Sequence, residues 1–436
     1  MNFRLFQHFL FPLGLVLALA IVGCGEDDKD GIEDPTAEEP GGVNVLSGNI
    51  TENTTLTADR EHLLQGAVFV EAGVTLTIEA GSKIYGEGAS NGTLIIKQGG
   101  KIMANGTEDL PIVMSSDKEP GNRKRGQWGG LIINGRAPTN QGITAGEGDT
   151  GDFGGNNPND SSGVLRYVRV EYAGIEFSPD NELNGIAFQG VGSGTIVENI
   201  QVHFNQDDGI EMFGGTVNVK RALVTGARDD SFDWTDGWTG KGQFWVAQQK
   251  GDAADNGFEN DNSSKNNEAT PRSAPKIYNV TLIGDPKGPQ SDIGMLIREG
   301  AAGTYRNIIV HGFRKSGLDI NNESSHALAQ SGTLSVQNCI FSNNTPNAFS
   351  YDDDGFDEAA WASQASFNNK EMDAKLMDPF NLTAPDFRPA VDSPAVNGTV
   401  SVANPPSDGF FEAVNFIGGV DPNNDWTKGW TTSAQN

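Results

Sequence analysis

Short runs in which apolar and polar residues alternate recur along most of the chain, separated by glycine, asparagine and aspartate. Clear runs are 164–172, 195–202, 276–283, 304–310 and 333–341, which are rich in β-branched residues. Alternation with a period of two predicts strands that turn one face toward a core. We therefore expect many short strands with tight corners, and one helix within 356–377.

One phrase of five positions recurs: a small or polar residue, a small residue, then apolar, variable and apolar. It begins at Asn184, Asp208, Asp230, Asn256, Ile293, Ser316 and Asn347, with steps of 24, 22, 26, 37, 23 and 31 residues. Clustered but irregular steps indicate a solenoid whose turns carry loop insertions of different lengths.

A second column supports the same register. Ile200, Ala222, Ile308 and Cys339 each lie eight residues before a phrase, so two strands with a fixed corner recur in each turn. Nearer the N-terminus, the run from Thr75 repeats after 18 residues. The pattern predicts an all-β chain that forms a right-handed parallel β-helix over 43–355. Long loops are expected at 140–162 and 250–275, and a C-terminal helix and capping segment over 356–436.

The chain starts with an apolar run, 9–22, that is too short to span a membrane and ends in Ile21-Val22-Gly23-Cys24. We interpret residues 1–23 as an export signal. The ending resembles the lipobox of bacterial lipoproteins, which implies that Cys24 carries acyl chains such as palmitate and anchors the protein to a lipid membrane. Residues 24–42 are acidic and poor in bulky apolar groups, which predicts a flexible tether.

The acidic run Glu26-Asp27-Asp28 resembles the surface-export signal of Bacteroidota lipoproteins. It implies an outer-membrane lipoprotein exposed at the cell surface, with a periplasm-facing protein as the alternative. The formal net charge of −28 argues against nucleic acid as a partner and makes cations the natural counter-species. Cys339 is the only cysteine besides Cys24, so no disulfide framework is expected.

Three consecutive phrases carry an acid at the position that alternation turns outward: Glu211, Asp233 and Glu259. Adjacent strands lie about 4.8 Å apart, so stacked carboxylates repel by about 1 kcal/mol in water and about 3 to 4 kcal/mol at an effective dielectric near 20. A partly shielded column of this kind favours a cation or a basic partner.

More acids lie at the adjacent corner: Asp207, Asp208, Asp229, Asp230 and Asp255. Together with the outward column they supply the oxygen ligands, about six to eight, that Ca²⁺ takes. We therefore predict a Ca²⁺ site on these eight acids. The alternative is that the column is solvated and that the corner residues bond backbone amides, as aspartate and asparagine often do in turns.

The same acids suit catalysis on polysaccharides. Paired carboxylates can act as acid and base in glycoside hydrolysis, and β-helix lyases combine Ca²⁺ with a lysine or arginine base, for which Arg228, Lys220 and Lys241 are candidates. The turn Gln206-Asp207-Asp208-Gly209 resembles the Asp-Asp turn of polygalacturonase-type hydrolases. Their Gly-His-Gly and Arg-Ile-Lys signatures are absent, so no catalytic residue is assigned.

Aromatic residues give a third candidate. Trp238 lies beside Gly237 and Gly240 in an expected turn, and we predict that it is exposed and stacks on a sugar ring. Trp234 has inward parity and is expected in the core. Cys339 shares the inward column, which predicts a small buried side chain.

Several longer segments are similar to a family of Bacteroidota-type β-helix surface lipoproteins of undetermined function. They are 128–138, 181–185, 207–215, 229–233, 255–262 and the closing 410–411 with 426–430. This resemblance implies the fold and the location, and it implies no reaction. We expect a surface-anchored β-helix that binds an extracellular glycan or another surface partner, with Ca²⁺ bound to the eight acids. The alternative is a polysaccharide lyase or glycoside hydrolase at the same place.

Overall fold

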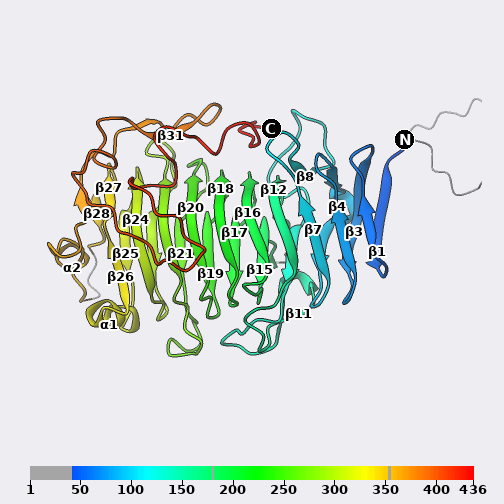
Figure 1. The fold of residues 1–436 in the computed structure, drawn as a ribbon, viewed down its shortest axis with the longest axis horizontal. Helices are drawn as coiled ribbons and strands as arrows, with labels where there is room; N and C mark the ends of the chain where they lie inside the picture. Colours follow the sequence, from blue (N-terminus) through cyan, green and yellow to red (C-terminus); the bar gives the residue numbers. More distant parts are fainter. Residues whose placement is uncertain (1–41, 179–180, 352–354) are drawn as a thin grey trace, which may run out of the picture. The chain divides into compact units, whose positions relative to one another are not determined.

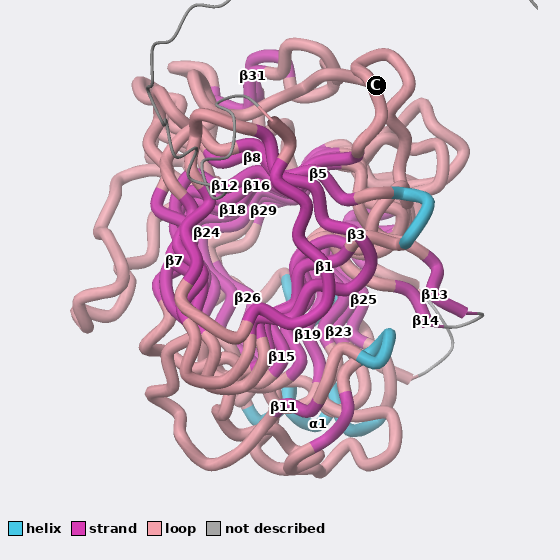
Figure 2. The backbone as a smooth tube through the Cα atoms, turned by 90° about the vertical axis from the view of Figure 1, so that its right-hand side faces the viewer, coloured by secondary structure: helices cyan, strands magenta, loops and turns pink. Residues whose placement is uncertain are grey.

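The computed structural model describes residues 42–178, 181–351 and 355–436. Twenty-five strands join in one coiled sheet whose neighbouring strands run parallel, and each turn of the chain stacks on the previous one (Figure 1). Seen along the coil axis, the strands of successive turns lie in walls around the core (Figure 2). The predicted parallel β-helix is confirmed.

One wall is built by the recurring phrase. It contains β6 (Thr93–Ile96), β9 (Gly130–Asn134), β15 (Ile186–Gln189), β17 (Ile210–Phe213), β19 (Phe232–Thr235), β21 (Phe258–Asn260), β23 (Ile293–Ile297), β25 (Ser316–Ile320) and β28 (Asn347–Phe349). The register pairs equivalent positions of successive phrases, for example Ile186 with Ile210 and Ile210 with Phe232. The spacing of the phrase thus corresponds to one turn of the coil.

Longer strands bend across the corners between walls. They are β1 (Asn44–Ile50), β3 (Glu61–Val70), β12 (Gly163–Glu171), β16 (Ile196–His203), β18 (Asn218–Thr225), β20 (Lys241–Gln248), β22 (Lys276–Ile283) and β24 (Gly303–His311). Each bend has a residue with positive φ. Six of these residues align at the corner between β7 and β8: Tyr167, Asn199, Arg221, Phe244, Asn279 and Asn307. Gly48 and Gly66 lie at the next corner, before the wall built by the phrase. Asparagine and glycine tolerate this left-handed conformation, which explains their frequency in the corners.

The remaining strands of the coil are short. They are β2 (Thr54–Leu56), β4 (Thr75–Ile78), β5 (Lys83–Gly86), β7 (Lys101–Asn105), β8 (Ile112–Ser116), β26 (Leu334–Gln337), β27 (Ile340–Ser342) and β29 (Lys370–Glu371). Three antiparallel pairs lie outside the coil: β10 (Thr144–Ala145) with β11 (Asp152–Phe153), β13 (Glu176–Ser178) with β14 (Asn181–Glu182), and β30 (Leu376–Asp378) with β31 (Asp386–Pro389).

Inward side chains fill the coil with aliphatic residues and one large aromatic cluster. Trp234 and Trp238 lie with ring centroids 5.3 Å apart, and Phe232 stacks on Trp245 at 4.7 Å. Trp234 and Cys339 are buried, as predicted. The prediction that Trp238 is exposed is wrong, because its side chain is 0% exposed and its Nε1 donates to the carbonyl oxygen of Val217 at 3.1 Å. The turn folds the indole into the core instead of presenting it to a sugar.

The C-terminal end of the coil is covered by α1 (Glu323–Ser331) and α2 (Glu358–Ala362) (Figure 1). Trp361 of α2 is 7% exposed, and its Nε1 donates to the carbonyl oxygen of Ala329 in α1 at 3.1 Å. The two helices therefore close the last turns over the core. Only α2 lies in the segment predicted as a cap, and α1 lies within the range predicted for the coil.

The final residues, 376–436, run back along the outside of the coil, and we name them the C-terminal strap. The side-chain amides of Gln201, Gln243 and Asn307 each donate to and accept from the backbone of one strap residue, at 2.7 to 2.9 Å. The strap also covers outward apolar residues of the longer strands and of β27: Leu223, Val246, Ile283, Ile309 and Ile340. It is thus a second layer on this flank of the coil.

Candidate cation site and adjoining pocket

The three outward acids lie one above another on the wall built by the phrase. Glu211 pairs in register with Asp233, and Asp233 pairs with Glu259. Their inward neighbours Ile210 and Phe232 are buried in the core, 1% and 0% exposed. The predicted stacking of the acids on one outward column is therefore confirmed.

All eight acids predicted as metal ligands come together. They form four groups of three, and within each group one carboxylate oxygen from each residue lies within 4.8 Å of the others. The groups are Asp207/Asp208/Asp229, Asp208/Glu211/Asp233, Asp230/Asp233/Glu259 and Asp229/Asp230/Asp255. Because each group shares a residue with the next, the eight acids make a closed set, which we name the acidic ring.

The acidic ring is partly buried: Asp208, Glu211 and Asp230 are buried, Asp229 is exposed, and the other four acids are intermediate. Asp208 and Glu211 are each 7% exposed, and Asp230 is 4% exposed. An insertion at 140–155 packs Phe153 of β11 against Phe213 and the apolar outward residues of neighbouring turns. This cover brings Glu147, in a 3₁₀ turn at Glu147–Asp149, close enough to raise the pKa of Glu211.

The corner acids also serve the backbone. Asp208 Oδ1 accepts from the amide of Asp230 at 2.9 Å, and Asp230 Oδ1 accepts from the amide of Asn256 at 2.6 Å. The alternative expectation, that corner residues bond backbone amides, is confirmed for these two residues. Each still has a second carboxylate oxygen, so the structural role and a ligand role are compatible.

Burial and mutual repulsion disfavour the ionised forms. Burial first, and neighbouring carboxylates second, raise the pKa of Asp208, Glu211, Asp230 and Asp233 well above the ordinary values. The pKa of Asp207 rises to about 7 for the same reasons. Without a counter-ion, the acidic ring must therefore hold protons near neutral pH.

One end of the ring has a basic partner. Arg298, just after β23, donates through Nη2 to Glu259 and through Nε to Asp261 Oδ1 at 2.9 Å. Burial still raises the pKa of Glu259 to about 7, although Arg298 opposes the shift. The positive charge is thus at the Glu259 end of the ring.

The other end has no such ion pair, although the charge of Arg298 partly opposes the rise in the pKa of Asp233. Over the described residues, no lysine or arginine forms an ion pair with Asp208, Glu211 or Asp233. Asn184 donates its Nδ2 to Glu211 Oε2, while Asn184 Oδ1 and Asp233 Oδ1 are buried without a hydrogen bond. Buried oxygen atoms without partners cost free energy, and a cation bound among them would remove that cost.

A cavity of about 240 Å³ adjoins the ring. Asp207 and Asp229 lie in its wall together with one basic residue, Arg228. The other lining residues are polar or small: Glu176, Glu182, Gln206, Ala253 and Gln290. The cavity therefore places carboxylate acceptors and one guanidinium around a space large enough for a single sugar unit.

Lys220 and Lys241, the other two candidate bases, are not at this cavity. They lie on β18 and β20 and form ion pairs with the strap, Lys220 with Glu412 at 3.1 Å and Lys241 with Asp408 at 2.7 Å. Both ammonium groups also lie over the ring of Phe410. Their role is to hold the strap, so only Arg228 remains as a candidate base.

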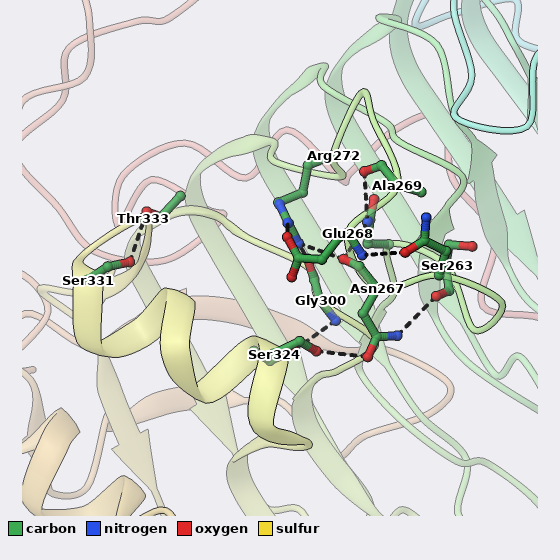
Figure 3. Close-up of polar contacts among 12 residues, drawn as sticks. Ser263, Asn267, Glu268, Ala269, Arg272, Gly300, Ser324, Ser331 and Thr333 are labelled. Atoms are coloured by element: carbon green, nitrogen blue, oxygen red, sulfur yellow. Dashed lines mark hydrogen bonds and ion pairs between the residues drawn. The ribbon is translucent and has the colours of Figure 1, made fainter.

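The loop that follows β21 is fixed by polar contacts of Asn267 and Arg272, which reach Gly300 and, in α1, Ser324 (Figure 3). Asn267 donates Nδ2 to Glu299 Oε2 at 2.6 Å and accepts from Ser324 of α1 at 2.9 Å. Arg272 donates to the backbone oxygen of Asn267 at 2.8 Å. Because Glu299 follows Arg298 directly, these contacts hold the backbone that presents the arginine to the ring.

Two residues of the site escaped the sequence analysis. Arg298 is three residues beyond Met295, which pairs with Phe258, so extending the register would have set it beside Asp261. Glu147 belongs to an insertion that does not repeat from turn to turn. No register therefore relates its position in the sequence to the acidic ring. Cys24 lies outside the described residues, and no helix that the structure describes is long and apolar enough to cross a membrane.

The family model described as a pectate-lyase-like β-helix domain matches residues 48–380. The match covers nearly the whole coil, including every acid of the ring, and ends near the start of the strap. No curated protein and no solved structure matches the chain.

Proposed function

The chain belongs to the pectate-lyase-like β-helix family, and on this premise we propose that it is a surface-anchored protein that binds an extracellular glycan with the help of Ca²⁺. The ion binds at the Asp208/Glu211/Asp233 end of the acidic ring. The glycan binds in the adjoining cavity. One observation carries the proposal: two buried carboxylates, Asp208 and Glu211, converge there with half-buried Asp233, and none of the three forms an ion pair with a described lysine or arginine.

Ca²⁺ suits this donor set better than smaller or softer ions. The ring offers only oxygen atoms, and Ca²⁺ accepts about six to eight of them in flexible geometry, whereas Mg²⁺ demands near-octahedral geometry and keeps several waters. A divalent charge would also let Asp233 and Glu211 ionise at neutral pH, which burial and repulsion otherwise oppose.

The cavity supports the glycan part of the proposal. Carboxylates of Asp207 and Asp229 accept hydrogen bonds from sugar hydroxyl groups, and Arg228 can bind an acidic substituent in bidentate geometry. Acylated Cys24 would hold the protein on the outer membrane, with the cavity free to meet extracellular chains.

Calorimetric titration with Ca²⁺ tests the cation site. The wild-type protein is expected to bind, and Glu211→Gln together with Asp233→Asn is expected to lower the affinity at least a hundredfold, because two of three charged ligands are lost. Asp392→Asn removes an exposed acid that pairs with Lys375 and belongs to none of the four groups, and this variant should bind as the wild type does. Absence of heat and an unchanged melting temperature with Ca²⁺ would refute the proposal.

A second candidate function is polysaccharide cleavage, which one observation favours. Asp207, with its pKa raised to about 7, and Arg228 line the same cavity. A group that titrates near neutral pH is suited to transfer protons, and the guanidinium can stabilise a uronate or a developing negative charge.

Product formation from acidic and neutral polysaccharides separates the two functions. If the protein is an enzyme, Arg228→Gln should lower turnover by about 10²-fold to 10⁴-fold while Ca²⁺ binding stays intact. Unsaturated products indicate a lyase, and new reducing ends without unsaturation indicate a hydrolase. If no polysaccharide yields either product, the protein is a binding protein.

A further inference from the structure

The first turn of the coil has an open edge. β1 and β2 pair on one side only, with β3 and β4, and no other described strand pairs with them. Their backbone groups on the other side are therefore free to bond a further strand. Val43 and Val45 at this edge are 56% and 53% exposed.

The opposite end of the coil is protected. There α1 and α2 lie over the last turns, and Trp361 packs into the core cluster. The last strand, β29, has two residues, Lys370 and Glu371, which are both charged and exposed. Short, charged edge strands are a common protection against strand addition, so this end is unsuited to accept a partner.

β1 in the first turn has none of these protections. β1 is seven residues long, and neither β1 nor β2 contains a charged residue or a proline. Outward Val45 lies in register with Leu63. A cavity of about 350 Å³ opens beside them, and its wall combines Val43, Leu63, Tyr85 and Pro120 with five charged residues: Glu61, Asp117, Lys118, Glu119 and Arg123. Val45 thus continues an outward apolar column, with Leu63 of β3, onto a strand that is uncharged and has no described partner on its other side.

We propose that two copies of the chain dimerise through this edge, with β1 of one copy pairing antiparallel to β1 of the other about a two-fold axis. Such an isologous contact uses the same surface twice and leaves no open edge. A head-to-tail array is excluded because the other end is covered. The net charge of −28 makes most surfaces of two copies repel, whereas β1 contains no charged residue, so the pairing strand itself brings no acid against its own copy.

Light scattering after gel filtration of the full-length protein in detergent tests the dimer. The wild type is expected at twice the mass of the chain. Val45→Lys sets two like charges near the two-fold axis and should raise the dissociation constant roughly a hundredfold, giving monomers. Val391→Lys makes the same change at a strap residue that is 90% exposed, and this control should stay dimeric.

Hydrogen exchange of residues 43–50 at two protein concentrations distinguishes pairing with a second copy from protection by another segment of the same chain. Protection that rises with concentration and is lost in Val45→Lys supports the dimer. Monomeric wild type, whether β1 is exposed or is protected at all concentrations by another segment of the same chain, overturns it. A dimer that survives in Val45→Lys, or an assembly larger than a dimer, also overturns it.

Discussion

In EDTA the protein is expected to become less stable as the pH rises from about 5 to about 8, the reverse of the behaviour of proteins whose acids are salt-bridged. The folded state raises the pKa of Asp207 to about 7 from the ordinary value of 3.8, so it binds a proton in a range where the unfolded chain has released one. Stability from this group is full below about pH 4 and is lost as the pH passes about 7. Asp208, Glu211 and Asp233 shift in the same direction and add to the loss.

The expected loss is several kcal/mol, since a single pKa unit corresponds to about 1.4 kcal/mol, and it should lower the melting temperature by at least about 5 °C. Thermal unfolding followed by circular dichroism across this pH range measures it. Glu211→Gln with Asp233→Asn should flatten the profile because amides do not titrate. The Asp392→Asn control should keep the wild-type slope. A melting temperature that rises with pH in EDTA would contradict the account of the acidic ring.

Truncation of the chain after Lys375 is expected to give an aggregated product. The strap covers outward apolar residues, among them Leu223, Val246 and Ile309, and each such side chain contributes about 1.5 to 3 kcal/mol when buried. Without the strap they form a continuous exposed stripe, and exposed stripes of this kind promote association. The soluble fraction after expression, followed by light scattering, measures the effect.

A point variant distinguishes the effect of exposing the apolar residues under the strap from the effect of shortening the chain. Ile417→Asp sets a charge into the cluster with Ile309 and Ile340, where Ile417 is 0% exposed, and should detach this part of the strap. Val391→Asp makes a similar change at a strap residue that is 90% exposed and should remain soluble and stable. Full solubility of the truncated chain would show that the coil does not need this second layer.

The coil could be predicted from the sequence because each turn repeats the same inward pattern. The register of the repeat alone predicted that Glu211, Asp233 and Glu259 lie in one column. The strand pairing confirms this prediction. The burial of that column could not be predicted in the same way. It depends on the insertion at 140–155, whose Phe153 packs across several turns without any periodic signal.

The lack of a periodic signal also explains why the burial of Trp238 and the path of the strap were not predicted. Parity describes residues within a strand, whereas Trp238 lies in a turn, and turns can fold a side chain inward. The strap pairs its backbone with side-chain amides such as Gln243, so its own sequence needs no strand pattern. Pairing of this kind requires a particular residue only in the strand that provides the side-chain amide, and none in the strap.

The most direct test of the central claim is the number of protons released when Ca²⁺ binds. Calorimetric titration at about pH 7 in two buffers with different ionisation enthalpies gives this number. Because the carboxylates of the ring hold protons in the absence of a cation, Ca²⁺ should displace about one proton or more per ion. The release should disappear in Glu211→Gln with Asp233→Asn. Binding heat that is the same in both buffers, or no binding heat in either, would contradict a cation site in the acidic ring.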